Sequence, residues 1–155
     1  MAKKAKPADP EVKIICRNRR ARHDYEIHEE VEAGMVLEGS EVKSLRSGRA
    51  DLVDGYAGVK DGELFLMSVH ISPYEKASRF GHDPKRIRKL LVQRKVIKRL
   101  EIKIKERGFT LVPLEMYFRK GWAKVRLGLA KGKKQYDNRD QIRRDEDRRA
   151  LRQMD

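Results

Sequence analysis

The turn at Asp61-Gly62 constrains the fold of this chain more than any other short segment. Both positions tolerate the positive φ angles that a tight two-residue hairpin turn requires. The preceding segment, 50–60, has an extended pattern, and alternate apolar residues of the following segment, 63–71, are expected to face inward. The sequence therefore predicts an antiparallel β-hairpin in the middle of the chain.

Further strands are predicted on both sides of this hairpin. They are short apolar segments, or segments in which apolar and polar residues alternate with the period of a half-buried strand. These segments are 12–16, 25–31, 109–118 and 122–129. Gly34 is expected to end the second of them, and Lys120-Gly121 is expected to form the turn between the last two.

Two segments have helical spacing instead. In 36–45 the apolar residues lie one or two turns apart, with Ser40 as a candidate cap and Gly48 at a suitable stop. In 85–107 they recur mostly at intervals of three and four, which predicts one amphipathic helix, or two helices broken near Gln93. Many short strands with few helices predict a mainly β protein, a small antiparallel barrel with two or three added helices.

The domain organisation follows from composition. The 155 residues suit a single domain, and a hydrophobic content of 39 % is enough for one modest core. Residues 1–10 are polar and contain two prolines, so we expect them to be disordered. We assign residues 11–130 to the barrel and residues 131–155 to a flexible basic tail.

The tail is almost wholly charged. Asp140 with Arg144, and Asp145 with Arg149, are pairs four residues apart with the acid first, which favours a helix. Its only apolar residues after position 140 are Ile142, Ala150, Leu151 and Met154. So few cannot offset the cost of ordering the segment, about 1–2 kcal/mol per residue. We expect the tail to be loose alone and helical on a polyanion; a plain solvated helix or a disordered end is the alternative.

The charge of the chain indicates a polyanionic partner. Charged residues make up 40 % of the sequence, and the formal net charge is +14. Nucleic acid is the first candidate and an acidic membrane surface the second, while solubility alone is a less specific explanation. The sequence contains no run of about 18 apolar residues, so it predicts no membrane-spanning segment. The N-terminus lacks the apolar centre of a signal peptide, and one cysteine, Cys16, excludes an internal disulfide, so we expect a cytoplasmic protein.

Three groups of basic residues are candidates for nucleic-acid contact. Arginine suits phosphate and stacked bases, and asparagine can read a base edge. The first group lies in 17–22, where a strand would place Asn18, Arg20 and Arg22 on one face. The second comprises Lys124, Arg126, Lys131, Lys133 and Lys134. The third, on the predicted helix, comprises Lys85, Arg86, Arg88, Lys89, Arg94 and Lys95.

Catalysis has little support in the sequence. No histidine pair has metal-ligand spacing, and no glycine-rich phosphate loop or nucleophile motif occurs. Asp51 and Asp54, with Glu41 near them, leave a metal-dependent nuclease as an alternative. Solvated acids beside a turn explain the same residues better. We therefore predict no enzyme activity, no catalytic or metal-ligating residue and no cofactor.

Seven segments carry a resemblance to a known family. They are NRRARHDYEI (18–27), GSEVKSLR (39–46), HISPY (70–74), DPKRIRKLL (83–91), LVPL (111–114), YF (117–118) and KGKKQYD (131–137). In this order they resemble small protein B, the bacterial proteins that bind transfer-messenger RNA (SsrA). The resemblance covers nearly the whole chain from Val12.

The resemblance implies a fold and a function. The body would be an oligonucleotide/oligosaccharide-binding (OB) barrel with added helices. It would deliver the tRNA-like domain of transfer-messenger RNA to stalled ribosomes for trans-translation, taking the place of the missing anticodon arm. The tail would become helical in the empty mRNA channel, near the small-subunit decoding centre. The partners would be this RNA and the ribosome, with no membrane and a monomeric free protein. A generic ribosomal or single-strand RNA-binding OB protein is the alternative.

The resemblance also implies site residues. Those matched to transfer-messenger RNA contacts are Asn18, Arg20, Glu32, Leu91, Lys124, Lys131, Lys133 and Lys134, and residue type adds Arg19 and Arg22. Those expected at the decoding centre are Tyr136, Asp137, Arg139, Ile142 and Met154. Asn138 stands where the family usually has lysine, and the tail after Ile142 is shorter and more acidic than in many relatives. From the residues alone, Glu32 could instead pair with a neighbouring arginine, and Leu91 is more typical of a core position.

Overall fold

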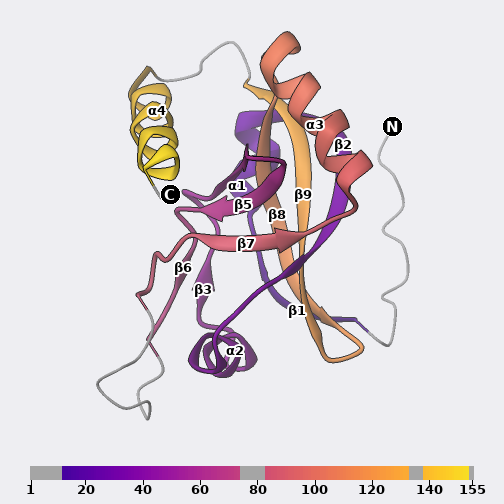
Figure 1. The fold of residues 1–155 in the computed structure, drawn as a ribbon. Coiled ribbons are helices and arrows are strands. Elements are labelled where there is room, and N and C mark those ends of the chain that lie inside the picture. Colours follow the sequence, from indigo (N-terminus) through magenta and orange to yellow (C-terminus); the bar gives the residue numbers. More distant parts are fainter. Residues whose placement is uncertain (1–11, 74–82, 133–137, 154–155) are drawn as a thin grey trace.

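The computed structural model of this chain describes residues 12–73, 83–132 and 138–153 (Figure 1). In this described part, five strands follow one another between the second and third helices, and the strands and helices are short. In chain order they are β1 (Val12–Arg17), α1 (Arg19–Asp24), β2 (Tyr25–Met35), α2 (Gly39–Arg46), β3 (Ala50–Asp51), β4 (Tyr56–Lys60), β5 (Glu63–Met67), β6 (His70–Ile71), β7 (Arg88–Leu91), α3 (Arg94–Arg107), β8 (Thr110–Arg119), β9 (Trp122–Gly132) and α4 (Asn138–Arg152).

The main sheet closes into a barrel. The pairings run β8–β4–β5–β7–β2–β9 and return to β8, and every one of them is antiparallel. Strand β1 adds to the outside of this ring by pairing with β8, while β3 and β6 form a separate two-stranded sheet. Closure removes the exposed edges that an open sheet would present. The predicted mainly β, OB-like barrel with added helices is confirmed.

Two predicted hairpin turns are confirmed by their backbone angles. Asp61 and Gly62 join β4 to β5 with φ values of 52° and 75°. Lys120 and Gly121 join β8 to β9 with φ values of 51° and 81°. Positive φ at both central positions gives a turn whose twist matches that of the flanking strands. Local chemistry therefore fixes the register of both hairpins.

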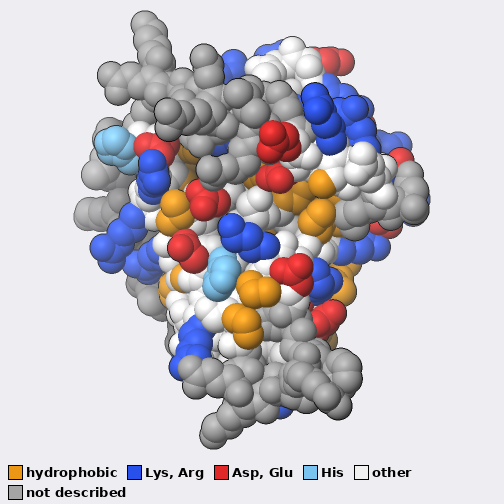
Figure 2. All heavy atoms as spheres, turned by 90° about the vertical axis from the view of Figure 1, so that its left-hand side faces the viewer, with side chains coloured by type: hydrophobic (Ala, Val, Ile, Leu, Met, Phe, Trp, Pro, Cys, Tyr) orange, Lys and Arg blue, Asp and Glu red, His pale blue; other side chains and the backbone are white. Residues whose placement is uncertain are grey.

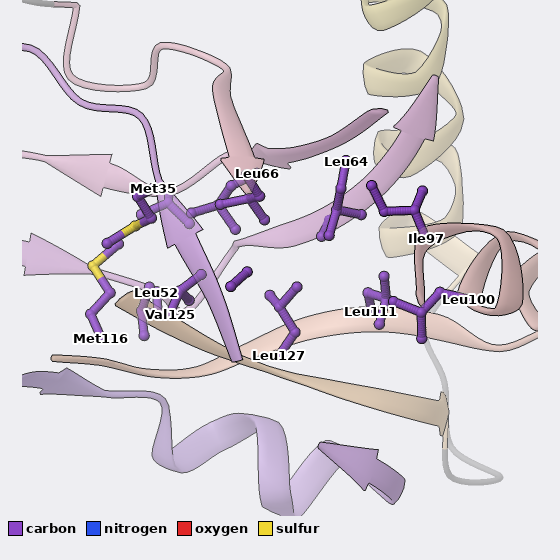
Figure 3. Packing of buried hydrophobic residues seen from close by; sticks show 14 of the residues in the cluster. Met35, Leu52, Leu64, Leu66, Ile97, Leu100, Leu111, Met116, Val125 and Leu127 are labelled. Carbon is purple, nitrogen blue, oxygen red and sulfur yellow. The ribbon is translucent and has the colours of Figure 1, made fainter. Parts of the chain in front are cut away.

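The core fills the barrel and is closed at one end by α3 (Figure 3). Leu64 and Leu111 come from strands, and Ile97 and Leu100 reach them from the helix. These four side chains are at most 5 % exposed. Burying leucine or isoleucine stabilises a fold by about 1.5–3 kcal/mol per side chain. The helix is thus held by its apolar stripe, while its opposite side remains charged.

The predicted helix over 85–107 is wrong in its first part. Residues 88–91 form β7, and α3 begins only at Arg94, after the possible break near Gln93. Within β7, Arg88 and Leu90 are buried whereas Leu91 is exposed, which is the alternation of a strand. The intervals of three and four in the sequence arose from a strand followed by a helix.

Two further predictions are corrected. Residues 19–24 form helix α1 and not a strand, so Asn18 does not share a strand face with Arg20 and Arg22. Gly34 does not end β2, which continues to Met35. The strand continues because Gly34 pairs with both of its neighbouring strands.

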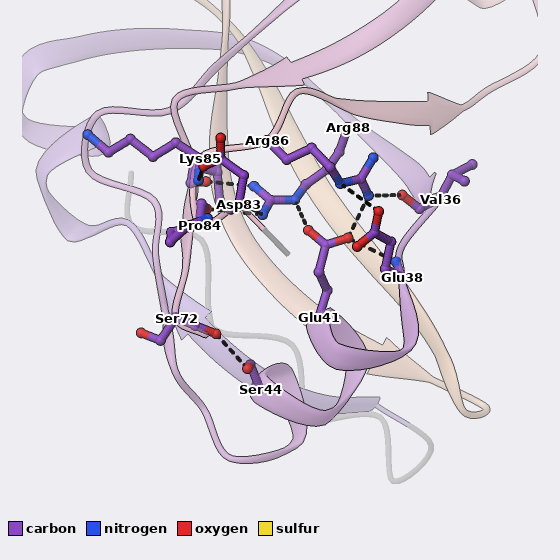
Figure 4. A network of polar contacts seen from close by, with 11 residues as sticks. Val36, Glu38, Glu41, Ser44, Ser72, Asp83, Pro84, Lys85, Arg86 and Arg88 are labelled. Carbon is purple, nitrogen blue, oxygen red and sulfur yellow. Dashed lines mark hydrogen bonds and ion pairs between the residues drawn. The ribbon is translucent and has the colours of Figure 1, made fainter. Parts of the chain in front are cut away.

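A buried ion pair joins α2 to β7 (Figure 4). Nε of Arg88 donates to Glu41 at 2.5 Å, Nη2 of Arg86 donates to the other carboxylate oxygen at 2.5 Å, and both Glu41 and Arg88 side chains are fully buried. Arg88 also donates to the carbonyl oxygen of Val69 at 2.7 Å. Burial alone would raise the pKa of Glu41, but hydrogen bonds from Arg86, the Glu38 amide and Arg88 lower it below its usual value. This network locks β7 in place.

Helix α4 packs against the barrel beside β4 and β5 (Figure 1). Leu151 is 4 % exposed and joins a small cluster with Tyr56 and Met67. Nζ of Lys60 donates to the carbonyl oxygen of Leu151 at 2.7 Å, and Oγ of Ser68 donates to Asp147 at 2.9 Å. The tail thus buries one of the few apolar residues that were expected to be too few to order it. Strand β9 also extends to Gly132, two residues beyond the predicted barrel boundary at 130.

Candidate nucleic-acid interface

The outer face of three barrel strands gathers several of the predicted RNA contacts. Along β9, Val125 and Leu127 point into the core, so Lys124 and Arg126 point outward. The pairing register places Glu32 beside Arg126 and Gly34 beside Lys124 in β2, and Tyr117 beside Lys124 in β8. We call this surface the β2–β9–β8 face. It comprises Glu32, Gly34, Glu115, Arg119, Lys124 and Arg126, with the side chain of Tyr117 fully buried among them.

Leu91 and Lys124 meet above Gly34. Gly34 pairs with Leu91 on one side and with Lys124 on the other. A Cβ added at Gly34 would lie 3.5 Å from Cβ of Leu91 and 3.6 Å from Nζ of Lys124. Leu91 is 56 % exposed, so the core position favoured by the sequence pattern is wrong. The barrel thus presents an ammonium group and an exposed apolar side chain side by side.

Glu32 is held by neighbouring protein groups. It accepts hydrogen bonds from Oη of Tyr117 at 2.5 Å and from Nη1 of Arg119 at 2.9 Å. Burial and the bond to Glu32 raise the pKa of Tyr117 to about 12, so its hydroxyl stays protonated and donates. The arrangement matches the alternative in which Glu32 pairs with an arginine. Its contact with RNA stays a prediction, and the geometry shows that Glu32 orients Arg119.

Arg126 is oriented in a similar way. Its guanidinium lies 5.4 Å from the centre of the Tyr117 ring, and its Nη1 lies 2.9 Å from a carboxylate oxygen of Glu115. Burial alone would lower the pKa of Arg126, but its contact with Tyr117 and nearby acidic groups raise that pKa above its usual value. Two arginines are therefore fixed in position on the β2–β9–β8 face, which lowers the conformational entropy lost when they bind an anion.

Asn18 has a structural role in this protein. Its side chain is buried, accepts from the amide of Ala21 at 3.1 Å, and donates to the carbonyl oxygens of Leu52 and Pro113 at 3.2 and 3.0 Å. It therefore caps α1 and anchors that helix to two other segments. Its predicted RNA contact stays untested, but these bonds already use its amide and carbonyl groups.

The remaining basic residues of this region lie on α1 and at the end of β9. Arg19, Arg20 and Arg22 are exposed on α1, where Arg20 pairs with Asp24 at 3.2 Å and Arg22 with Glu30 at 2.9 Å. Lys131 is exposed on β9, with Nζ 4.6 Å from the centre of the Phe109 ring. Because Tyr25 pairs with Gly132, the C-terminal end of α1 adjoins this end of β9.

The described site residues thus form two groups along the β2–β9 ladder. One lies around Lys124 and the other around Lys131, about 23 Å apart for seven residues of extended strand. Lys133, Lys134, Tyr136, Asp137 and Met154 lie outside the described residues. Arg139 and Ile142 belong to α4, but their side chains are not among those described.

The third basic group is not a continuous surface. Arg88 is fully buried against Glu41, Arg86 also pairs with Glu41, and Lys89 lies 3.1 Å from Glu63. Figure 2 shows the α4 side of the molecule, where the coloured acidic and basic side chains are interspersed. Among the described residues visible there, no continuous basic patch forms. The β2–β9–β8 face and α1 are therefore the better candidates for RNA contact.

Glu41 is not available as the third acidic residue of the nuclease alternative. Both carboxylate oxygens of Glu41 are bound by arginines, and Oδ1 of Asp51 accepts from the amide of Val53 at 2.9 Å. Within residues 12–73, 83–132 and 138–153, no cluster of three or more acidic, histidine or cysteine side chains has metal-binding geometry. No helix in this described part is long and apolar enough to span a membrane.

Sequence reasoning did not single out Gly34, Tyr117 or Arg119 as parts of the candidate interface. Alternation along the last two strands carries a signal for Tyr117 and Arg119, because residues 117, 119, 124 and 126 share one face across the predicted turn. Gly34 has no such signal. Its place between Leu91 and Lys124 depends on which strands pair with β2.

Comparison with known proteins places these features in a family. The profile of the family described as SmpB protein matches residues 15–155. An SsrA-binding protein of Enterococcus faecalis is 56 % identical over 136 residues, which cover 88 % of each chain. An SsrA-binding protein of Syntrophobacter fumaroxidans is 55 % identical over 149 residues, covering 96 % of this chain and 92 % of the relative.

A solved structure agrees with the sequence relatives. It is described as "tmRNA-SmpB: a journey to the center of the bacterial ribosome", and its chain shares 54 % identity with this one. The superposition has a TM-score of 0.66 and covers 79 % of this chain and 86 % of the other. Both the length of the match and the identity far exceed what a shared fold alone would produce. This chain belongs to the SmpB protein family.

Proposed function

We propose that this chain binds transfer-messenger RNA and acts with it in trans-translation on the ribosome. The proposal is supported by its membership of a family whose relatives are SsrA-binding proteins. The structural observation that carries it is the pairing of Lys124 with the exposed Leu91 over Gly34, beside two oriented arginines. Such a surface suits a folded RNA, which is recognised mainly through shape, phosphate and 2′-hydroxyl contacts.

The barrel binds the tRNA-like domain and brings it to a stalled ribosome. Lys124 neutralises phosphate charge, while Leu91 contacts the sugar or base surface next to it. The high net charge of +14 steers the association and makes it sensitive to salt. The chain acts as a monomeric RNA-binding protein in the cytoplasm, by positioning its partners and not by catalysis.

The tail enters the empty mRNA channel near the decoding centre. In that role Tyr136, Asp137 and Arg139 contact the decoding centre, followed by Ile142 and Met154 further along the tail. Helix α4 is already formed beside the barrel in this structure, where Leu151 holds it. Entry into the channel therefore requires α4 to leave the cluster around Leu151.

RNA selectivity tests the function. We would measure affinity at near-physiological salt for the tRNA-like domain, for an elongator tRNA, and for an unstructured RNA of equal length. We expect at least tenfold selectivity for the tRNA-like domain, which corresponds to about 1.4 kcal/mol. Equal affinity for all three, lost together as salt rises, would instead identify a generic basic RNA-binding protein.

A charge variant tests the proposed surface. Lys124→Ala should lower affinity for the tRNA-like domain by about tenfold and reduce the salt dependence by about one counterion. Lys105→Ala removes the same charge from the far part of α3, where its ammonium lies 3.5 Å from Glu101, and serves as the matched control. We expect less than a twofold effect from the control. Equal losses in both variants would show that net charge, and not the β2–β9–β8 face, governs binding.

A further inference from the structure

Trp122 is the most exposed large apolar side chain in the described part of the chain. It begins β9, directly after the Lys120-Gly121 turn, and its exposed fraction is 73 %. The next most exposed, Leu91, stands at 56 % and already belongs to the candidate interface. At a hairpin tip an indole contributes little to the core. Its large exposed aromatic surface is therefore available to a partner.

The pairing register puts Trp122 on the β2–β9–β8 face. Trp122 is the cross-strand partner of Arg119, and Lys124 follows it on the same side of β9. Successive residues on one side of a strand lie about 6.6 Å apart, so Trp122 and Lys124 occupy neighbouring positions on this face. Arg119 is oriented by Glu32 at 2.9 Å. Trp122 thus extends the surface formed by Leu91 and Lys124 to the tip of the hairpin.

We infer that Trp122 stacks on an unpaired base of the bound RNA. This inference rests on the proposed function and adds a base contact to a surface otherwise suited to phosphate. Unpaired bases in the loops of folded RNAs stack on aromatic side chains, and neighbouring cations hold the adjoining phosphates. Trp122 lies among the cations Arg119, Lys120 and Lys124, which favours a polyanion over an uncharged protein surface.

The stacking is directly observable because the chain contains a single tryptophan. Tryptophan fluorescence, excited where tyrosine absorbs little, therefore reports on Trp122 alone. The full-length protein would be titrated with the tRNA-like domain and, separately, with polyphosphate, which carries charge but no bases. We expect the RNA to quench the emission strongly at saturation and polyphosphate to leave it nearly unchanged. Equal quenching by both, or none by the RNA, would overturn the inference.

Affinity measurements on variants give a second test. Trp122→Ala should weaken binding of the tRNA-like domain by between about fivefold and 150-fold, and Trp122→Phe should retain most of the affinity. Ile102→Ala removes a side chain that is 53 % exposed on α3 and should change affinity less than twofold. If the wild type were selective for the tRNA-like domain but Trp122→Ala bound it with unchanged affinity, the stacking inference would be refuted and the proposed function would stand. Loss of selectivity in the wild type would refute the proposed function.

Discussion

The buried carboxylate of Glu41 offers a sharp test of how this fold is held together. Glu41 in α2 accepts from Arg86 and Arg88, and the side chains of Glu41 and Arg88 are fully buried (Figure 4). Glu41→Gln keeps the volume of the side chain and removes its charge. The amide NH₂ would then face guanidinium donors, and Arg88 would remain buried without its counter-ion. We therefore expect this nearly isosteric change to be strongly destabilising.

The magnitude follows from the burial of the pair. Removing one partner of a buried ion pair costs about 3–5 kcal/mol, because the remaining charge is left uncompensated. A domain of this size unfolds with a free energy of roughly 5–15 kcal/mol, so the loss is a large share of the total. At about 2–4 °C per kcal/mol, Tm should fall by roughly 6–20 °C. Denaturant titration and thermal unfolding by circular dichroism would measure it.

A matched control lies three residues earlier. Glu38→Gln removes the same charge from a side chain that is 54 % exposed and lies 3.8 Å from Arg86. An exposed pair contributes only about 0–1 kcal/mol, so its Tm should change little. If Glu41→Gln were no more destabilising than Glu38→Gln, the buried network would not hold β7 in the barrel. The double variant Glu41→Leu with Arg88→Met should recover part of the stability, since it removes both fully buried charges and leaves only Arg86, which is 30 % exposed, without Glu41.

The pH dependence of stability gives an independent test of the Glu41 ion pair. The pKa of Glu41 is lowered in the folded protein, so its stabilising effect is full above the unfolded pKa, about 4.3. That contribution is lost as pH falls through the folded pKa. The stability difference between the wild type and Glu41→Gln should therefore shrink below about pH 4. A difference that stayed constant down to the acid transition would contradict the pKa shift.

Three further predictions concern the tail, the cysteine and a close approach in the core. Leu151→Asp should abolish hydrogen-exchange protection of α4, because burial of this leucine, which is 4 % exposed, stabilises the docked helix by about 1.5–3 kcal/mol. Ala150→Asp, at the neighbouring exposed position, should preserve the protection. Burial raises the pKa of Cys16 to about 11, so its alkylation at pH 8 should be on the order of a hundredfold slower than in the denatured chain; equal rates would exclude the shift. Gly55→Ala should destabilise the protein by about 1–3 kcal/mol, because the added Cβ would lie 2.5 Å from Cγ2 of Val69. The Cβ added by Gly39→Ala would have no atom within 4 Å, so this control should not destabilise the protein.

Where local chemistry decides the structure, the sequence predicted it. Asp61-Gly62 and Lys120-Gly121 specify hairpins because only a few residue types accept positive φ at both central positions. The first, second and last strands could be identified from their apolar runs and alternation, because successive residues of a strand point to opposite faces of the sheet. The net charge of +14 and the ordered family motifs indicated an RNA partner before the tertiary structure was considered.

Where contacts join distant segments, only the tertiary structure decided. Arg88 lies in a strand and is buried because Glu41, 47 residues earlier, supplies its counter-ion. The alternation along β7 that buries Arg88 also turns Leu91 outward to lie beside Lys124, although its spacing suggested a core helix. Leu151 is buried because β4 and β5 offer it an apolar site, which no periodicity within the tail encodes. The sequence determined turns, strand periods and charge, whereas the burial of Arg88 and the site above Gly34 depend on which strands meet.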